Sequence, residues 1–246
     1  MSYGFHLVVE GDYACFTRSE AKVERASYDV PTPGALEGLL KSIYWKPALQ
    51  YYIDRIVVFH PIQFTNIRRN EVKSKVSLSA VKSQMKGSSG TPEIYTSEAR
   101  TQRAAMILKD VKYGISFHFE RTFLRSDHED ESDEKHYNIL LRRLQKGQQF
   151  RQPCLGCREF PVKRMELVDA FDLHEVADEN KGDRDLGWML YRMQFQDKGI
   201  PQNGDWEHPK FSDAANAVYY HPHMIDGVID VAQSTGRRSH ADKSVM

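Results

Sequence analysis

The chain has 246 residues, enough for one large domain or two small ones with a hydrophobic core. Lys plus Arg and Asp plus Glu both number 34, so the net charge selects neither a nucleic acid nor a membrane surface as the partner. No stretch approaches the roughly 18–20 apolar residues of a membrane span, and the start of the chain lacks the basic residues typical of a signal peptide.

The first third of the chain predicts a strand, a helix and a second strand. Apolar residues alternate over residues 3–9, which indicates a strand. Thr32 and Pro33 are typical of the cap and first position of a helix, which must end before Pro47 because proline disfavours helical conformation in the preceding residue. The apolar run at residues 56–64 predicts the second strand.

The middle of the chain predicts an insertion, a third strand and a second helix. Residues 65–110 are polar, basic and rich in Gly and Ser, so we expect a long inserted loop with a helical turn near residues 100–108. Residues 113–119 alternate as a strand. Ser132 or Asp133 caps the next helix, and Gly147 ends it.

A fourth strand near residues 158–168 completes the order β-α-β-β-α-β, allowing for one short strand that the pattern does not reveal. This α+β order is the ferredoxin-like arrangement, which is also the RRM skeleton. We therefore expect a ferredoxin-like domain over residues 1–168 and a small β-rich C-terminal region over residues 169–232. The polar tail, residues 233–246, is expected to be disordered.

Two helix termini carry side chains suited to acid–base chemistry. Lys135 and His136 open the second helix, where the helix dipole and the acidic run at residues 127–134 shift the imidazole pKa in opposite directions. Because the two effects oppose each other, we expect the pKa of His136 to stay at about 6.5, the ordinary value for histidine. Such a pKa suits a general acid or base. Tyr44, at the end of the first helix, offers a hydrogen-bond donor. Considered alone, each residue is more often structural than catalytic.

Metal and thiol sites are weaker alternatives. Cys154 and Cys157 form a CxxC pair, but a zinc site needs a second pair and only Cys15 remains, so a turn is favoured. The count of three cysteines lacks a disulfide framework and indicates a reducing, cytoplasmic setting. His221 and His223 lack an accompanying carboxylate cluster in the sequence, so we expect no metal or cofactor.

Several segments together resemble the type I-C CRISPR-associated protein 5 family (Dvulg subtype) of the RAMP superfamily, over most of residues 3–232. The segments that carry the resemblance are residues 11–14, 27–33, 42–47, 135–136 and 154–161. The resemblance implies an endoribonuclease that cuts the repeat hairpin of precursor crRNA. It also implies that the protein stays at the crRNA 5′ end, with other subunits of the interference complex as partners.

The catalytic tyrosine and Lys-His pair of that family resemble Tyr44, Lys135 and His136. The hypothesis is metal-independent attack by the RNA 2′-OH, with basic side chains on the RNA backbone. The expected RNA contacts are Arg68, Arg69, Lys73, Lys75, Arg142, Arg143 and Lys146. One alternative is a non-catalytic crRNA-binding subunit. A weaker one is a metal-dependent DNA nuclease.

Overall fold

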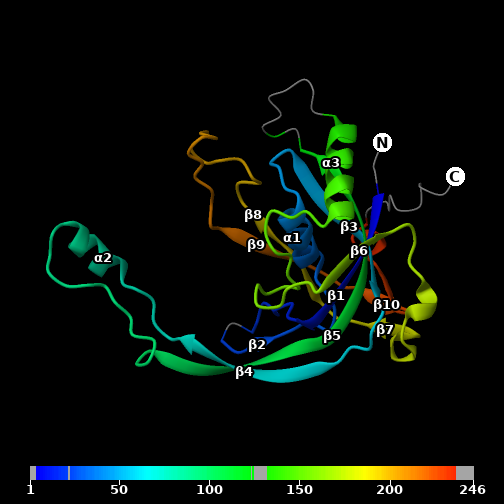
Figure 1. Cartoon of the computed structure of the whole chain (residues 1–246), viewed down its shortest axis with the longest axis horizontal. Helices are drawn as coiled ribbons and strands as arrows, with labels where there is room; N and C mark the ends of the chain where they lie inside the picture. The colour runs from blue at the N-terminus through cyan, green and yellow to red at the C-terminus, as the bar shows by residue number, and fades with distance from the viewer. Residues whose placement is uncertain (1–3, 22, 123, 125–131, 237–246) are drawn as a thin grey trace.

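The computed structural model describes residues 4–21, 23–122, 124 and 132–236 as a mixed α+β fold built on a largely antiparallel sheet (Figure 1). The longest strand is β5 (Arg100–Arg121), with 22 residues. Its C-terminal half pairs with β1 (Gly4–Ala14) on one edge and with β3 (Leu49–Val58) on the other. Its N-terminal half pairs with β4 (Phe64–Val72).

Other short strands extend this sheet. β6 (Arg164–Val168) pairs with the outer edge of β1, and the sheet order along this path is β6-β1-β5-β3-β11-β10-β7. The remaining strands of the sheet are β2 (Arg25–Ala26), β7 (Asp183–Asp185), β10 (His223–Ile225) and β11 (Val228–Asp230). A separate ribbon is formed by β8 (Met189–Phe195) and β9 (Ala215–Tyr220).

The two principal helices, α1 (Pro33–Ile43) and α3 (Asp133–Lys146), lie on the same face of the sheet (Figure 1). Alternate residues of β5 point toward this face: Phe117 stacks on Phe5, which in turn stacks on Tyr137 of α3. The smaller helices are α2 (Leu78–Met85), α4 (Val231–Ser234), η1 (Leu173–Glu175) and η2 (Asp178–Asn180). In the described part of the chain, no helix is long and apolar enough to cross a membrane.

The observed boundaries of α1 and α3 agree with those predicted from the sequence. The Thr32 hydroxyl accepts from the Ala35 amide at 3.3 Å, and α1 ends at Ile43, before Pro47. The Ser132 hydroxyl accepts from the Lys135 amide at 3.1 Å, and Gly147 ends α3 with φ +63. These predictions are confirmed because caps are local: the residues that make the bond lie within one turn of each other.

The predicted loop over residues 65–110, with its helical turn at 100–108, is wrong at both ends, where the chain forms strands. Residues 64–72 and 100–108 pair as the antiparallel strands β4 and β5, joined through α2, and form an arm that extends from the sheet (Figure 1). Their backbone groups are satisfied across the ladder, so the strands need few apolar side chains; Ala105 and Ile107 supply a small buried cluster. The predicted strand at 56–64 is correct only at residues 56–58, since β3 begins at Leu49 and ends at Val58, and Phe64 already belongs to β4.

The C-terminal residues share the sheet and core of the rest. β11 pairs with β3, and Met189, Tyr220 and Ile229 belong to the same buried cluster as Leu7. The predicted disordered tail begins within α4, since residues 233 and 234 are helical. The rest of that prediction, at residues 237–246, lies outside the described residues, as does Tyr3 of the first predicted strand.

Gly156 should be intolerant of any side chain. Its φ is +84, and an added Cβ would lie 2.0 Å from the carbonyl oxygen of Cys15. We expect Gly156→Ala to lower the free energy of unfolding by more than about 2 kcal/mol in urea titrations. Gly147→Ala is the matched control, because its φ is +63 but nothing lies within 4 Å. It should cost only about 1–2 kcal/mol, and equal losses in the two variants would contradict the steric explanation.

Candidate active site

The C-terminus of α1 positions the Tyr44 side chain. Tyr44 caps the helix in an extended conformation, with φ −146 and ψ 124, and its amide donates to the Leu40 carbonyl at 3.1 Å. This change of direction carries the phenol away from the α1 axis and into the core, where the side chain is buried. The site therefore begins at a helix end, as the sequence predicted for this residue.

At the N-terminus of α3, the side chains of Lys135 and His136 point in different directions. Consecutive helical residues lie about 100° apart around the axis, so Lys135 is exposed while His136 is buried. The Arg121 side chain at the end of β5 forms an ion pair with Asp133 at 2.5 Å, which ties the first turn of α3 to the sheet. Of the acidic run at residues 127–134, positions 127–131 lie outside the described residues.

Tyr44 and His136 meet between the two helices. Tyr44 Oη lies 2.9 Å from His136 Nδ1, a hydrogen bond in which the tautomer of the imidazole decides the donor. The ring of Phe119 on β5 stands edge-on to the imidazole, with centroids 6.5 Å apart. Only 1% of His136 and 4% of Tyr44 is exposed, so the contact lies in a water-poor environment that strengthens it.

Two further side chains fix the phenol. The Arg143 guanidinium lies over the Tyr44 ring at 5.1 Å and donates to the Ile43 carbonyl at 2.6 Å. Tyr51 Oη donates to the Tyr44 carbonyl at 2.7 Å. Burial raises the pKa of Tyr51, so this hydroxyl stays protonated as a donor. Sequence reasoning missed Tyr51 because it placed the start of the second strand at residue 56.

The basic residues expected to bind RNA do not gather in one place. Arg142 and Lys146 are exposed on α3, whereas Arg143 is engaged with the end of α1. The four basic residues near β4 lie on or beside the arm that extends away from α3 (Figure 1). Of these, the exposed side chains are Arg68, Lys73 and Lys75.

Arg69 is the exception on the arm. Its guanidinium binds Glu159 and lies 3.6 Å from Glu71. The bond to Glu159 is the main reason that the pKa of Arg69 is raised further. Two carboxylates therefore already balance the charge of this half-buried arginine, and it is less available to a phosphate than its exposed neighbour Arg68.

The CxxC segment forms a turn, as predicted from the sequence. Its two cysteines, Cys154 and Cys157, and the nearby Cys15 form no disulfide. Cys157 lies beside Cys15, with the Arg25 guanidinium donating to its sulfur at 3.5 Å. The hydrogen bond with the Cys15 thiol lowers the pKa of Cys157 to about 6, and Arg25 adds to the effect. Burial raises the pKa of Cys154.

Comparison with known proteins gives consistent matches along the chain. Residues 5–232 match the family model for Cas5d, described as CRISPR-associated protein (Cas_Cas5). A relative from Mannheimia succiniciproducens, named CRISPR pre-crRNA endoribonuclease Cas5d, is 42% identical over 94% of this chain and 96% of its own. A relative of the same name from Thermus thermophilus is 37% identical over 79% of this chain and 75% of its own.

Solved structures match at the level of the fold. One, titled "Crystal Structure of CRISPR-associated Protein", superposes with a TM-score of 0.61 at 23% identity and covers 95% of this chain and 94% of its own. That likeness supports the same arrangement of helices and strands.

The low pKa of Cys157 leads to a direct test. A thiol with a pKa near 6 is largely thiolate at pH 7, and the thiolate is the reactive form. We expect the rate at which iodoacetamide alkylates Cys157 to reach half of its maximum near pH 6. Peptide mass spectrometry measures this rate for each cysteine. Cys154 is the internal control and should react only at higher pH. Identical pH profiles for the two thiols would contradict the assignment.

Proposed function

This chain belongs to the Cas5d family of CRISPR-associated proteins, and from that membership we propose that it is an endoribonuclease that cuts precursor crRNA within the repeat hairpin. Two relatives that carry this name align with most of the chain. The single observation that supports the chemistry is the 2.9 Å contact between Tyr44 Oη and His136 Nδ1, next to the exposed cation of Lys135.

We also propose that the core is the ferredoxin-like domain of the RAMP superfamily. The elements β1, α1, β3, β5, α3 and β6 follow each other in the order β-α-β-β-α-β, with β2, β4 and α2 as additions. Within the sheet the four strands stand in the order β6-β1-β5-β3, with antiparallel neighbours. The topology of the sheet supports this proposal. In such a topology both helices lie on one face of the sheet, so their ends can share a site.

In the proposed reaction the nucleophile is the RNA's own 2′-OH, so no metal is needed to generate one. The 2′-oxygen attacks the adjacent phosphorus and loses its proton to a base, while the bond from phosphorus to the 5′-oxygen breaks. The leaving 5′-oxygen takes a proton. The products are a 2′,3′-cyclic phosphate and a 5′-hydroxyl, and the charges and protons balance without a cofactor.

The three side chains take different parts in this reaction. His136 transfers a proton to or from the RNA, because an imidazole nitrogen can accept a proton or donate one. Tyr44, bonded to Nδ1, fixes the orientation of the ring and positions the phosphate. Lys135 stabilises the negative charge that develops on the phosphate oxygens. Arg143 and Tyr51 act through Tyr44 and are positioning residues.

Burial of the pair sets a condition on this mechanism. Tyr44 and His136 are both nearly inaccessible, so RNA reaches them only when neighbouring side chains move. The cost of such an opening would appear in the rate of cleavage more than in RNA affinity, because exposed cations such as Lys135, Arg142 and Lys146 bind phosphates without it.

The same burial favours one alternative. If Tyr44 and His136 serve only to join α1 to α3, the protein binds crRNA without cutting it and remains at the crRNA 5′ end among the other subunits of the type I-C complex. The two functions differ in a single observable, which is cleavage of the repeat by the isolated protein.

Cleavage of the cognate repeat hairpin in EDTA tests the proposal. We expect wild type to cut and to leave a cyclic phosphate, and His136→Ala to bind the RNA but cut at least about a hundredfold more slowly. A substrate with 2′-deoxy at the cleavage nucleotide should stay intact. Loss of wild-type activity in EDTA, or cleavage of the deoxy substrate, would exclude 2′-OH attack.

Matched tyrosine variants separate chemistry from stability. Tyr44→Phe and Tyr51→Phe each remove one buried hydroxyl bond, so each should cost about 1–2 kcal/mol of stability. Only Tyr44→Phe removes the contact with His136, and we expect it to slow cleavage tenfold or more while Tyr51→Phe changes the rate less. Equal effects on cleavage would mean that Tyr44 acts only through packing.

The arm is tested by salt dependence. If Lys73 and Lys75 each neutralise an RNA phosphate, the double alanine variant should reduce the slope of log K against log salt by roughly 1–2. Lys163→Ala is the control, because that exposed lysine pairs with Asp12 at 2.7 Å and belongs to no predicted contact. An unchanged slope in the Lys73/Lys75 variant would remove the arm from the RNA interface.

A further inference from the structure

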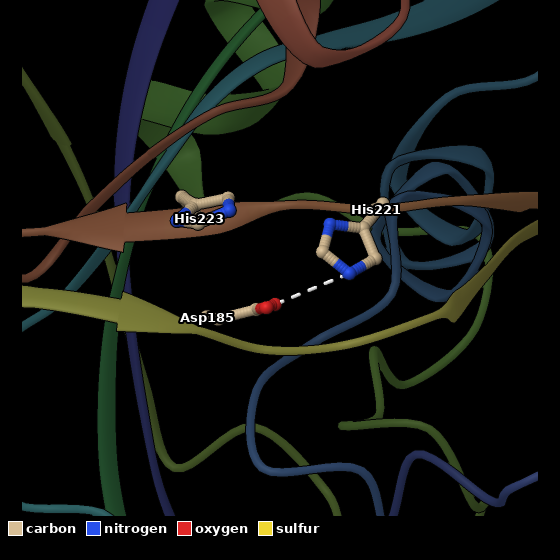
Figure 2. Close-up of side chains that lie close together, drawn as sticks. All are labelled: Asp185, His221 and His223. Carbon is tan, nitrogen blue, oxygen red and sulfur yellow. Dashed lines mark ion pairs between the residues drawn. The ribbon is translucent and has the colours of Figure 1, made fainter.

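His221 and His223 lie together near one end of the main sheet, where β10 pairs with β7. Residues two apart in an extended chain project to the same side, so Pro222 separates two imidazoles that share a face. β10 pairs with β7 in a register that sets His223 opposite Asp185. Figure 2 shows the Asp185 carboxylate pointing toward His221, with one ring nitrogen of His223 on the side that faces His221.

The distances bring one ligand atom of each side chain into a small volume. One ligand atom each from Asp185, His221 and His223 lie within 4.8 Å of one another. His221 Nε2 and Asp185 Oδ1 are already 3.3 Å apart. Ligand bonds of about 2 Å in a tetrahedral site set neighbouring ligand atoms roughly 3.3 Å apart. All three side chains are exposed, so small rotations suffice to bring the third ligand to this separation.

Neighbouring groups orient the cluster. Asp183 Oδ1 lies 3.0 Å from His223 Nδ1, which holds the proton on Nδ1 and leaves the lone pair on Nε2 for a ligand. Carboxylates commonly orient metal-binding histidines in this way. The Gly187 amide donates to Asp185 Oδ1 at 2.8 Å and fixes that carboxylate. The Leu186 amide donates to the Pro222 carbonyl at 3.1 Å, so a backbone bond joins the two ligand-bearing segments.

Two imidazoles and one carboxylate select a class of ion. Mg²⁺ and Ca²⁺ prefer oxygen ligands alone, whereas nitrogen with oxygen suits Zn²⁺, Co²⁺, Ni²⁺ and Cu²⁺. Three protein ligands leave a fourth position for water or for a group from another molecule. The sequence did not favour this site because its carboxylate is remote in the chain and reaches the histidines only through the pairing of β7 with β10.

We propose that Asp185, His221 and His223 bind a divalent transition metal ion of the zinc class. The ion joins β7 to β10. β7 has three residues, all exposed, and pairs with β10 at the end of the sheet path, so it has little apolar contact to hold it. A bound ion adds a side-chain cross-link to the backbone bonds that already join the two segments. This inference does not rest on the proposed nuclease activity.

Calorimetric titration of EDTA-treated, dialysed protein with Zn²⁺ tests the site. We expect one ion per wild-type chain, at least about a hundredfold weaker binding in His223→Ala, and a tenfold or greater loss in Asp183→Asn, which removes only the orienting carboxylate. His208→Ala is the matched control, because this exposed histidine lies 3.6 Å from the single carboxylate of Asp205. It should bind Zn²⁺ as wild type does.

Two further readouts distinguish this site from other metal binders. The Trp188 ring lies 5.4 Å from His221, so Cu²⁺ should quench its fluorescence, and Trp188→Phe should remove that quenching while keeping Zn²⁺ binding. Zn²⁺ at a hundredfold excess over the wild-type Kd should raise Tm by about 5 °C or more in wild type and in His208→Ala, and should leave the Tm of His223→Ala nearly unchanged.

The proposal fails if wild type binds no Zn²⁺, or if His223→Ala binds it as tightly as wild type. It also fails if Cys157→Ser abolishes binding while His223→Ala retains it, because the thiols would then hold the ion. His223→Ala must unfold in EDTA at the wild-type Tm, within about 2 °C, as expected for an exposed residue. If it does not, Asp185→Asn, which keeps both histidines, takes its place in the comparison.

Discussion

The length of β5 is the constraint on which the rest of the structure depends. One strand of 22 residues pairs with β1 and β3 over its C-terminal half and with β4 over its N-terminal half. Its alternating side chains direct Phe117 and Phe119 to a single face. Both principal helices cover that face, and only for this reason do the end of α1 and the start of α3 come within hydrogen-bonding distance.

The contact between Tyr44 and His136 is consequently a packing contact as well as a chemical one. Buried polar groups cost free energy unless they are bonded. Here the Tyr44 hydroxyl bonds the imidazole of His136, and the Tyr44 carbonyl accepts from the hydroxyl of Tyr51. A site built this way is rigid and well oriented. Its orientation comes at the expense of access, because the same packing that aligns the groups also covers them.

The sequence allowed correct prediction of what is decided locally. The caps at Thr32 and Ser132, the end of α1 and the turn at Gly156 each depend on residues close in the chain. The strands at 64–72 and 100–108 were missed because their partners are each other, across an insertion whose polar composition is typical of a loop. Asp185 was missed for the same reason: only strand pairing brings it to His221. The three proposed catalytic side chains were located through the resemblance, and their spacing alone would not have joined them.

The order of the strands in the chain also governs how the protein can fold during synthesis. β1 leaves the ribosome before β5, and its partner residues 108–118 follow about a hundred residues later. At roughly 5–20 residues per second, the first strand waits on the order of 5–20 s with both edges unpaired. Formation of the central sheet is therefore a late event with high contact order. During that interval the alternating apolar residues of β1 are open to chaperones or to aggregation, a kinetic liability that the completed fold conceals.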